Sequence, residues 1–292
     1  MLITFGEVLE VGIRRLQEAK VADAKRDAES LLLFLMHEDR KFLFLHRNDG
    51  TDEYQADAYF DLIDRRAEGE PLQYIVGNQE FMGLPFDVNE SVLIPRQDTE
   101  TLVELALEKA KEKKRSLAVL DMCCGSGAIA VSIAHFLPKA KVTACDISAE
   151  ALAVARKNAE KNGLGGRIDF RESDLFHVKK RNKIIQMKET FDMILSNPPY
   201  IPTDVIGTLQ TEIKDHEPLT ALDGGADGLD FYRRISQDAS VNLKKGGFLI
   251  LEIGSEQADS VSSLLEASED YEDIEIHKDL AGLDRVVICR KR

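Results

Sequence analysis

The stretch that decides the fold of this chain is Val119-Leu120-Asp121-Met122-Cys123-Cys124-Gly125-Ser126-Gly127-Ala128-Ile129-Ala130. Residues 117–120 are apolar and predict a buried strand, and the apolar run 128–136 predicts a buried helix. Between them, Gly125 and Gly127 allow a tight turn and the close approach of a ligand to the backbone. A strand, a glycine turn and a helix together form a nucleotide-type site in which the helix N-terminus faces the ligand.

The glycines alone do not choose a cofactor. With Ala130 in the last place, the turn also fits the looser dinucleotide pattern G-x-G-x-x-G/A. The turn lacks the Lys-Ser/Thr of a phosphate-binding loop, which argues against a triphosphate. Asp121 closes the strand just before the turn, where its carboxylate could meet a cationic or hydroxylated ligand.

A second predicted strand, Lys141 to Cys145, ends in another carboxylate, that of Asp146. An acid at this place is suited to accept both hydroxyls of a ribose. The alternative is a helix N-terminal cap shared with Ser148, and the two roles are compatible.

A third polar group follows the mostly apolar run Phe191 to Leu195, which predicts a buried parallel strand ending at Ser196. The next residues are Asn197-Pro198-Pro199-Tyr200, and the two prolines stiffen this turn and remove two N–H donors. The side-chain oxygen of Asn197 and the backbone oxygen of Pro198 can converge on a substrate –NH2 group. The ring of Tyr200 offers a flat face against which a planar group could lie. A strand-terminating turn with an Asn cap remains the alternative for this motif taken alone.

Together these residues resemble the Class I S-adenosylmethionine-dependent methyltransferases. The segment Asp121 to Gly127 is similar to their first motif, Asp146 to their ribose-binding acid, and Ser173-Asp174-Leu175-Phe176 to the segment that flanks adenine. Asn197 to Tyr200 is similar to the motif with which members methylate a nitrogen conjugated to a π system.

The resemblance extends to the release factor glutamine methyltransferases (the PrmC/HemK family) and covers essentially the whole sequence. It is carried by Gln79-Glu80-Phe81-Met82-Gly83-Leu84, by Leu93-Ile94-Pro95-Arg96-Gln97-Asp98-Thr99-Glu100, and by Glu217-Pro218-Leu219-Thr220-Ala221-Leu222 with the glycines that follow. Two positions depart from the family pattern: Cys123 stands where a first glycine is usual, which puts the close backbone approach there in doubt, and Gln97 stands where proline is expected.

The resemblance implies an enzyme that transfers a methyl group from S-adenosyl-L-methionine to the side-chain N5 of the glutamine in the Gly-Gly-Gln motif of class 1 peptide chain release factors. The implied catalytic residues are Asn197, Pro198 and Tyr200. The implied cofactor-binding residues are Asp121, Cys123, Cys124, Gly125, Ser126, Gly127, Asp146, Ile147, Asp174, Leu175 and Asn197. The implied substrate-binding residues are Asn197 to Tyr200, with Arg96 and Glu100, for which surface pairing is the alternative.

Two other function classes remain open from the sequence. A relative could methylate another protein glutamine or an exocyclic amine of RNA or DNA, and a non-enzymatic protein could merely bind the cofactor. Labelled cofactor offered to release factor and to ribosomal RNA would separate these possibilities. The expected chemistry needs no metal, and the six histidines are scattered without metal-ligand spacing.

Composition and charge favour a protein substrate. The 292 residues are 43% hydrophobic and 31% charged, as in a globular protein. The net charge is −14, and residues 1–92 hold 10 Lys and Arg against 19 Asp and Glu. A polyanion-binding enzyme normally carries a basic stripe. The two basic clusters, Lys109 to Arg115 and Lys179 to Lys183, are interpreted as solvated surface, so direct nucleic-acid binding is not expected.

Four cysteines without a CxxC pair fit a reducing, cytoplasmic location. The apolar run Leu31 to Met36 is too short to cross a bilayer, and residues 1–20 lack the features of a secretory leader. We therefore expect no membrane contact, and we expect a monomer.

The organisation predicted is a small all-α domain over 1–77 that docks the substrate, a β-hairpin linker over 78–92, and a methyltransferase domain over 93–292. Helical spacing of apolar residues predicts helices near 3–19, 23–37 and 54–67, and a shorter apolar piece at 42–45 belongs to the same domain. Asp98 or Thr99 is expected to cap a helix that runs to about residue 113.

Beyond this helix, alternating strands and helices predict a doubly wound, Rossmann-like parallel sheet. Its strands are expected at 117–121, 141–145, 168–171, 191–195, 247–253, 272–276 and 284–289. Its helices are expected at 127–136, 148–162, 229–243 and 255–267. The seven-stranded order and an antiparallel last strand are implied by the resemblance alone. Residues 201–227 are expected to form a substrate-facing loop.

Overall fold

The computed structural model describes residues 3–113, 115–180 and 183–292. The chain divides into two compact units: Met1–Gly77 with Gln210–His216, and Asn78–Leu209 with Glu217–Arg292. Lys114 and Arg181, which belong to the two basic clusters of the sequence, lie outside the described residues. Within the described residues, no helix is long and apolar enough to cross a membrane.

The first unit is entirely helical. Its helices are α1 (Phe5–Glu18), α2 (Ala24–Met36), α3 (Arg40–Leu45), α4 (Glu53–Ala67), α5 (Leu72–Val76) and α10 (Thr211–Lys214). The helix α1 begins with a capping box in which the Thr4 hydroxyl accepts from the Glu7 N–H and the Glu7 carboxylate accepts from the Thr4 N–H. The fully buried Leu16, Leu31 and Tyr59 form part of its core. The three helices predicted here, α1, α2 and α4, are confirmed, and the apolar piece at 42–45 lies in α3. The short helix α5 was not predicted, because a single turn carries too little periodicity.

The predicted loop 201–227 is folded into three short helices, α9 (Thr203–Ile206), α10 and α11 (Leu219–Leu222). The middle one, α10, belongs to the helical unit. Its Glu212 pairs at 2.8 Å with Arg66, whose side chain is only 10% exposed. Arg66 also pairs with the buried Asp27 at 2.8 Å. A guanidinium so far from water needs both carboxylates.

The second unit is built around one mixed sheet whose strand order is β10-β11-β9-β8-β3-β4-β5-β6-β7. Neighbouring strands from β5 to β9 in this order run parallel, and β11 is antiparallel to both β9 and β10. The strands are β3 (Ala118–Met122), β4 (Lys141–Asp146), β5 (Ile168–Asp174), β6 (His177–Lys180), β7 (Lys183–Gln186), β8 (Phe191–Ser196), β9 (Leu243–Glu252), β10 (Tyr271–Lys278) and β11 (Asp284–Lys291). The doubly wound fold and its antiparallel last strand are confirmed.

The expected count of seven strands is wrong for this sheet, because β6 and β7 extend its edge to nine strands in the described residues. These two strands pair antiparallel, with Val178 opposite Ile185. All four residues of β7 are exposed. A strand without a buried face lacks the apolar alternation by which strands are recognised in a sequence.

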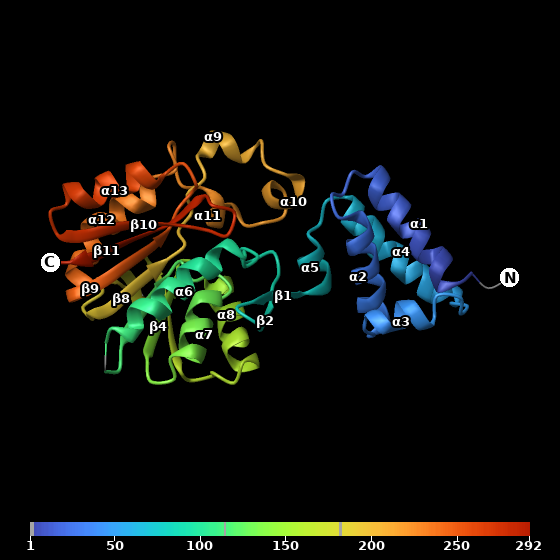
Figure 1. The fold of residues 1–292 in the computed structure, drawn as a ribbon, viewed down its shortest axis with the longest axis horizontal. Coiled ribbons are helices and arrows are strands. Elements are labelled where there is room, and N and C mark those ends of the chain that lie inside the picture. The colour runs from blue at the N-terminus through green and yellow to red at the C-terminus, as the bar shows by residue number, and fades with distance from the viewer. Residues whose placement is uncertain (1–2, 114, 181–182) are drawn as a thin grey trace. The chain divides into compact units, whose positions relative to one another are not determined.

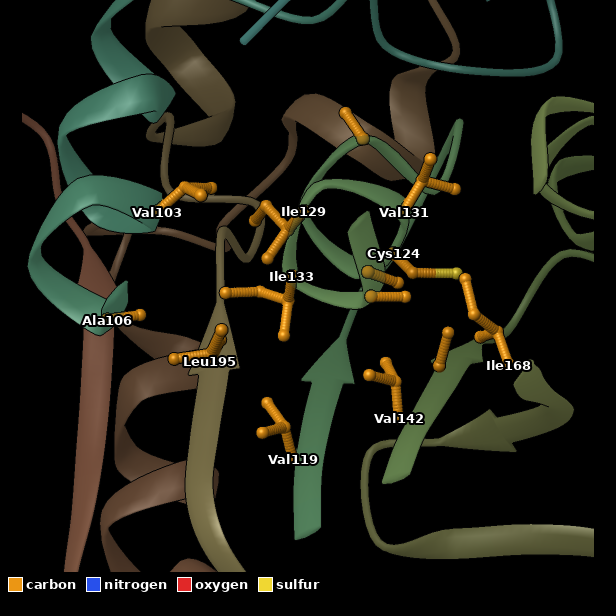
Figure 2. Packing of buried hydrophobic residues seen from close by; sticks show 14 of the residues in the cluster. Val103, Ala106, Val119, Cys124, Ile129, Val131, Ile133, Val142, Ile168 and Leu195 are labelled. Atoms are coloured by element: carbon orange, nitrogen blue, oxygen red, sulfur yellow. The ribbon is translucent and has the colours of Figure 1, made fainter. Parts of the chain in front are cut away.

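Helices cover both faces of the sheet (Figure 1). One face packs against α6 (Asp98–Lys111), α7 (Ala128–Phe136) and α8 (Ala149–Lys161), and the other against α12 (Asp230–Asn242) and α13 (Ala258–Ala267). Successive residues of β3 point to opposite faces, so Val119 belongs to one core cluster and Leu120 to the other. Figure 2 shows Val119, Val142 and Leu195 from neighbouring strands facing Ile133 of α7.

A separate two-stranded hairpin, β1 (Asn78–Phe81) and β2 (Leu84–Asp87), forms where a hairpin was expected. The side-chain Oδ1 of Asn158, in α8, accepts from the Asp87 N–H at 2.7 Å. The amide Nδ2 of Asn158 donates to the backbone oxygens of Asp87 and Ser126, each at 2.9 Å. This buried side chain therefore holds the hairpin next to the glycine turn.

The predicted cap of α6 is wrong. The helix begins at Asp98, with Gln97 in the cap position, and the Gln97 side chain makes no capping hydrogen bond. Thr99 is 5% exposed, and its hydroxyl is engaged by Asn197 instead.

Candidate active site

A cavity of about 430 Å³ lies at the carboxyl ends of β3, β4, β5 and β8. This is the edge of a parallel sheet at which ligands bind, and the volume suits a small molecule. The structure brings eleven of the predicted site residues to this cavity: Arg96, Cys123, Cys124, Gly125, Ser126, Asp146, Ile147, Asp174, Leu175, Asn197 and Pro199. Five predicted residues do not line it: Glu100, Asp121, Gly127, Pro198 and Tyr200.

Asp121 lies beneath the glycine turn rather than in the cavity. It is fully buried, and its Oδ2 accepts from the Ala130 N–H at 2.9 Å. Burial raises the pKa of this carboxyl well above its usual value. Asp121 thus fixes the first turn of α7.

Cys123 has φ of 61°, in the left-handed region, at the position where the family usually has glycine. The backbone therefore keeps the glycine conformation in spite of the substitution, at a cost of about 1–2 kcal/mol for a residue with a Cβ. Burial raises the pKa of the thiols of Cys123, Cys124 and Cys145, the last to about 11. Neutral thiols are poor nucleophiles, so these three cysteine side chains pack in the cavity wall and are not expected to react.

Asp146 ends β4 and faces the cavity. Its Oδ2 accepts from the Gly125 N–H at 2.8 Å, and its Oδ1 accepts from the Ser148 N–H at 2.9 Å. Burial raises its pKa, an effect that these N–H donors oppose. The predicted cap also forms, because the Ser148 hydroxyl accepts from the Ala151 N–H at 3.0 Å. Each carboxylate oxygen keeps a lone pair for a further donor, such as a ligand hydroxyl.

The turn 197–200 is held from outside by the segment that follows β9. The Nε2 of Gln257 donates to the backbone oxygen of Tyr200 at 3.0 Å. Gly228 has φ of +74°, and a Cβ there would stand 2.3 Å from the same Tyr200 oxygen. The close approach of these two backbones requires glycine at this place. The Tyr200 hydroxyl donates to Glu252 Oε1 at 3.5 Å, and its ring packs on the core cluster under α12.

Asn197 lines the cavity, and its side-chain amide is hydrogen-bonded to Thr99. Its amide Nδ2 donates to Thr99 Oγ1 at 3.2 Å. The two residues that follow it, Pro198 and Pro199, are buried prolines, so the turn is rigid directly after Asn197. The carbonyl oxygen of Asn197 is thereby left as an acceptor for a ligand.

The two charged residues expected near the substrate differ. Arg96 lines the cavity and pairs with the buried Glu217 at 2.6 Å. Glu100 accepts from the Met82 N–H at 2.5 Å, in the turn of the β1–β2 hairpin. Arg96 therefore combines a salt bridge with a place in the cavity wall, whereas Glu100 bonds to a backbone N–H of the hairpin and does not line the cavity.

Several residues that line the cavity were not named as site residues from the sequence: Val92, Leu93, Pro95, Thr99, Ser148, Asp223, Phe231 and Arg234. Arg234 pairs with Asp174 at 2.6 Å, and its guanidinium lies 5.9 Å from the centroid of the Phe231 ring. Phe231 and Arg234 belong to α12. The amphipathic pattern of this helix in the sequence is that of an ordinary surface helix, so it did not indicate that the two residues belong to a site. Residues 218–221 also line the cavity, and their motif had been noted only through the family resemblance.

The comparisons agree with these motifs. Residues 7–77 match the family model of the PrmC N-terminal domain, and residues 97–212 match the methyltransferase small domain. A release factor glutamine methyltransferase from Clostridium acetobutylicum is 44% identical over 263 residues, which cover 90% of this chain and 90% of the relative. One from Moorella thermoacetica is 41% identical over 290 residues, covering 99% of each protein.

Among solved structures, a 16S rRNA methyltransferase from T. thermophilus in complex with AdoMet and guanosine superimposes with a TM-score of 0.50. It is 19% identical in sequence, and the match covers 74% of this chain and 50% of that protein. This likeness shows the shared methyltransferase fold. The identity over nearly the full length of the relatives goes further: the chain belongs to the family of release factor glutamine methyltransferases.

Proposed function

We propose that this enzyme transfers a methyl group from S-adenosyl-L-methionine to the amide N5 of the glutamine in the Gly-Gly-Gln motif of class 1 peptide chain release factors, a modification of the translation termination machinery. The observation that carries the proposal is that one cavity is lined both by the carboxylate of Asp146 and by the acceptor turn at Asn197.

The residues of the cavity fit this cofactor. Asp146 offers carboxylate oxygens to the ribose hydroxyls, and Leu175 and Phe231 offer apolar surface to the adenine. Gly125 has φ of +52°, and a Cβ built there would meet nothing within 4 Å, so the backbone is open toward the ligand. When bound, S-adenosyl-L-methionine supplies an electrophilic methyl group on a positively charged sulfur.

The acceptor turn suits an amide nucleophile. An amide nitrogen reacts poorly because its lone pair is delocalised into the carbonyl group. The Oδ1 of Asn197, which lines the cavity, can accept one N–H of the substrate amide, and the backbone oxygen of Pro198, which does not line the cavity in this structure, is proposed to accept the other. Two fixed acceptors orient the nitrogen toward the methyl group, and such orientation contributes several kcal/mol. The cofactor's positive charge disperses during transfer, so the site needs no metal ion and no strong base.

We further propose that residues 1–77 dock the release factor. This unit is acidic, because residues 1–77 hold 10 basic against 16 acidic residues. It also exposes three large apolar side chains, those of Phe44 (87% exposed), Leu45 (68%) and Tyr54 (83%). Exposed apolar residues of this size are typical of protein interfaces. We propose a cytoplasmic monomer that has no direct contact with nucleic acid.

The described members of the basic clusters support this choice of partner. Lys109 pairs with Glu275 at 3.0 Å, Lys179 pairs with Glu172, and Lys113 donates to the Gly246 oxygen at 3.1 Å. Cations engaged by the protein's own acceptors are less available for phosphates.

The test is the intact mass of release factor after incubation with the enzyme and cofactor, with peptide mapping of the modified residue. We expect one added methyl group, on the glutamine of the Gly-Gly-Gln loop, and none when that glutamine is replaced. A short Gly-Gly-Gln peptide should react far more slowly than the intact factor if residues 1–77 dock it. Methylation of ribosomal RNA, or of a different residue, would replace the proposal with one of the alternatives.

A further inference from the structure

The turn between β10 and β11, residues 279–283, exposes an unbroken run of apolar residues. Positions 280–283 are Leu-Ala-Gly-Leu, and all four residues are exposed. Leu280 is fully exposed, and Leu283 is 49% exposed. Single apolar residues at a surface are normal, but a run of four is expected only where it serves a function. This apolar turn is therefore a candidate contact surface.

The carboxylate of Asp279 holds the apolar turn in one conformation. Its Oδ1 accepts from the N–H groups of Ala281 at 2.9 Å and of Leu283 at 3.0 Å. The backbone adds two hydrogen bonds, from the Asp279 N–H to the Leu283 oxygen at 2.9 Å and from the Gly282 N–H to the Asp279 oxygen at 3.0 Å. The turn is thus preorganised, so a partner that contacts it does not first have to order it.

The apolar turn projects from the same edge of the sheet as the cavity. The parallel strands β8 and β9 end at this edge, where Ser196 pairs with Leu251. The antiparallel β11 begins there, because its Val286 lies opposite Glu252, the last residue of β9. The turn comes directly before β11. Neighbouring strands are about 4.8 Å apart, so the turn stands two strands, or roughly 10 Å, from the end of β8 and the acceptor turn.

Side-chain contacts connect the apolar turn to the residues beside the acceptor turn. Arg285, whose side chain is 11% exposed, pairs with Asp279 at 3.1 Å and with Asp98 at 3.5 Å. Asp98 is the first residue of α6, and the next residue, Thr99, accepts from Asn197 Nδ2 at 3.2 Å. The place of the apolar turn relative to Asn197 is therefore fixed by ordered contacts within one unit of the chain.

A protein whose glutamine reaches Asn197 has to cover this edge of the sheet. A specific protein interface buries about 800 Å² on each partner, and a circular patch of that area has a radius of about 16 Å. A turn roughly 10 Å from the acceptor turn lies within such a patch. Interfaces carry their apolar side chains near the centre, and burying an exposed leucine against apolar surface is favourable.

Resting on the function proposed above, we propose that the apolar turn is a docking surface for the release factor, in which Leu280 packs on an apolar part of the factor beside its Gly-Gly-Gln loop. The contact adds affinity for the intact factor and takes no part in methyl transfer.

Leu280→Ser tests this docking surface, with Val241→Ser as the matched control. Val241 is 66% exposed and lies just before the start of β9, at the opposite edge of the sheet. For intact release factor, kcat/KM should fall about 10-fold in Leu280→Ser, through a higher KM and with kcat within about twofold of the unmodified enzyme. Val241→Ser should keep kcat/KM within about twofold.

A short Gly-Gly-Gln peptide separates docking from damage to the site. The peptide lacks the surface beside the loop, so Leu280→Ser should methylate it as fast as the unmodified enzyme does. Leu280→Met keeps an apolar side chain and should retain kcat/KM for the intact factor within about threefold. Equal losses on the peptide and the intact factor, or an unchanged kcat/KM for the intact factor, would overturn the docking surface.

Binding measured without turnover distinguishes this inference from the proposed function. By calorimetry, the dissociation constant of release factor should be about 10-fold higher for Leu280→Ser than for Val241→Ser. If the unmodified enzyme leaves release factor unmethylated, the proposed function fails, while this difference in Kd still decides the docking surface. Equal dissociation constants would overturn it, and so would a change of oligomeric state in Leu280→Ser, which would assign the turn to a second copy of this chain.

Discussion

The two turns that line the cavity are stabilised in different ways. The glycine turn after β3 is held largely by backbone N–H groups of its own neighbourhood, those of Ala130 on Asp121 and of Gly125 on Asp146. The turn at Asn197 is held by hydrogen bonds to side chains from distant parts of the sequence, those of Thr99 in α6 and of Gln257 before α13.

The difference fits the role proposed for each turn. A turn that faces a phosphate-free nucleoside needs close backbone approach, which glycines and nearby carboxylates provide within one motif. A turn that holds a substrate amide needs acceptors of fixed direction, and direction must come from a surrounding network of hydrogen bonds. The first turn should therefore respond to changes in backbone conformation, and the second to loss of single polar atoms.

The largest effect is expected at the acceptor turn. Asn197→Ala should lower kcat by about 10² to 10³-fold, because it removes the oriented acceptor that is proposed to act on the transition state. Cofactor affinity should stay largely intact, since the cofactor is assigned mainly to the glycine turn. Steady-state kinetics with saturating release factor, together with calorimetry of cofactor binding, checks both statements. A variant that keeps the unmodified kcat would end the role assigned to the turn.

The same comparison explains how far the sequence could be interpreted alone. The glycine turn, Asp146 and the 197–200 turn were all recognised, because each is a short contiguous motif that follows an apolar strand. The places of Thr99 and Glu252 were not, because their partners lie 98 and 52 residues away from them in the sequence. Thr99 was interpreted as a helix cap, the usual role of threonine at the start of a helix. Likewise β6 and β7 were missed, since their residues carry no buried face.

The second expected effect concerns the carboxyl group behind the acceptor turn. Burial raises the pKa of Glu252 from 4.5 to about 7, and a difference of this size corresponds to roughly 3 kcal/mol. Between these two pH values the folded protein binds more protons than the unfolded protein. The free energy of unfolding should therefore decrease as the pH rises from 4.5 to 7, and this contribution should be absent from Glu252→Gln.

Native-state hydrogen exchange of the β9 amides, compared between Glu252→Gln and the unmodified protein at pH 5 and pH 8, measures that contribution for this unit. The difference between the two proteins should change by roughly 3 kcal/mol between the two conditions. Parallel behaviour of the two proteins would mean that Glu252 titrates normally.

At the glycine turn, Asp146→Ala should weaken cofactor binding by about 1–3 kcal/mol, the usual cost of losing hydrogen bonds to a charged acceptor. Asn197→Ala is the matched control, because it alters the other turn of the same cavity. Calorimetry should separate the two variants, with affinity lost in the first and kept in the second. Unchanged affinity in a folded Asp146→Ala protein would remove this carboxylate from the cofactor site.

The smallest effect should come from the backbone of the glycine turn. Gly127 has φ of +80°, and a Cβ there would lie 3.0 Å from the Cβ of Ala155 in α8. Gly127→Ala should destabilise the fold by about 1–2 kcal/mol through the left-handed conformation, and the close contact with Ala155 should add to this loss.

Gly163 is the matched control, because its φ is +72° and a Cβ would meet nothing within 4 Å. Urea unfolding should show a larger loss for Gly127→Ala than for Gly163→Ala, and Ala155→Gly should abolish the excess in the double variant. Equal losses at the two glycines would mean that conformation alone, and not the packing of α8 against the turn, requires glycine at position 127.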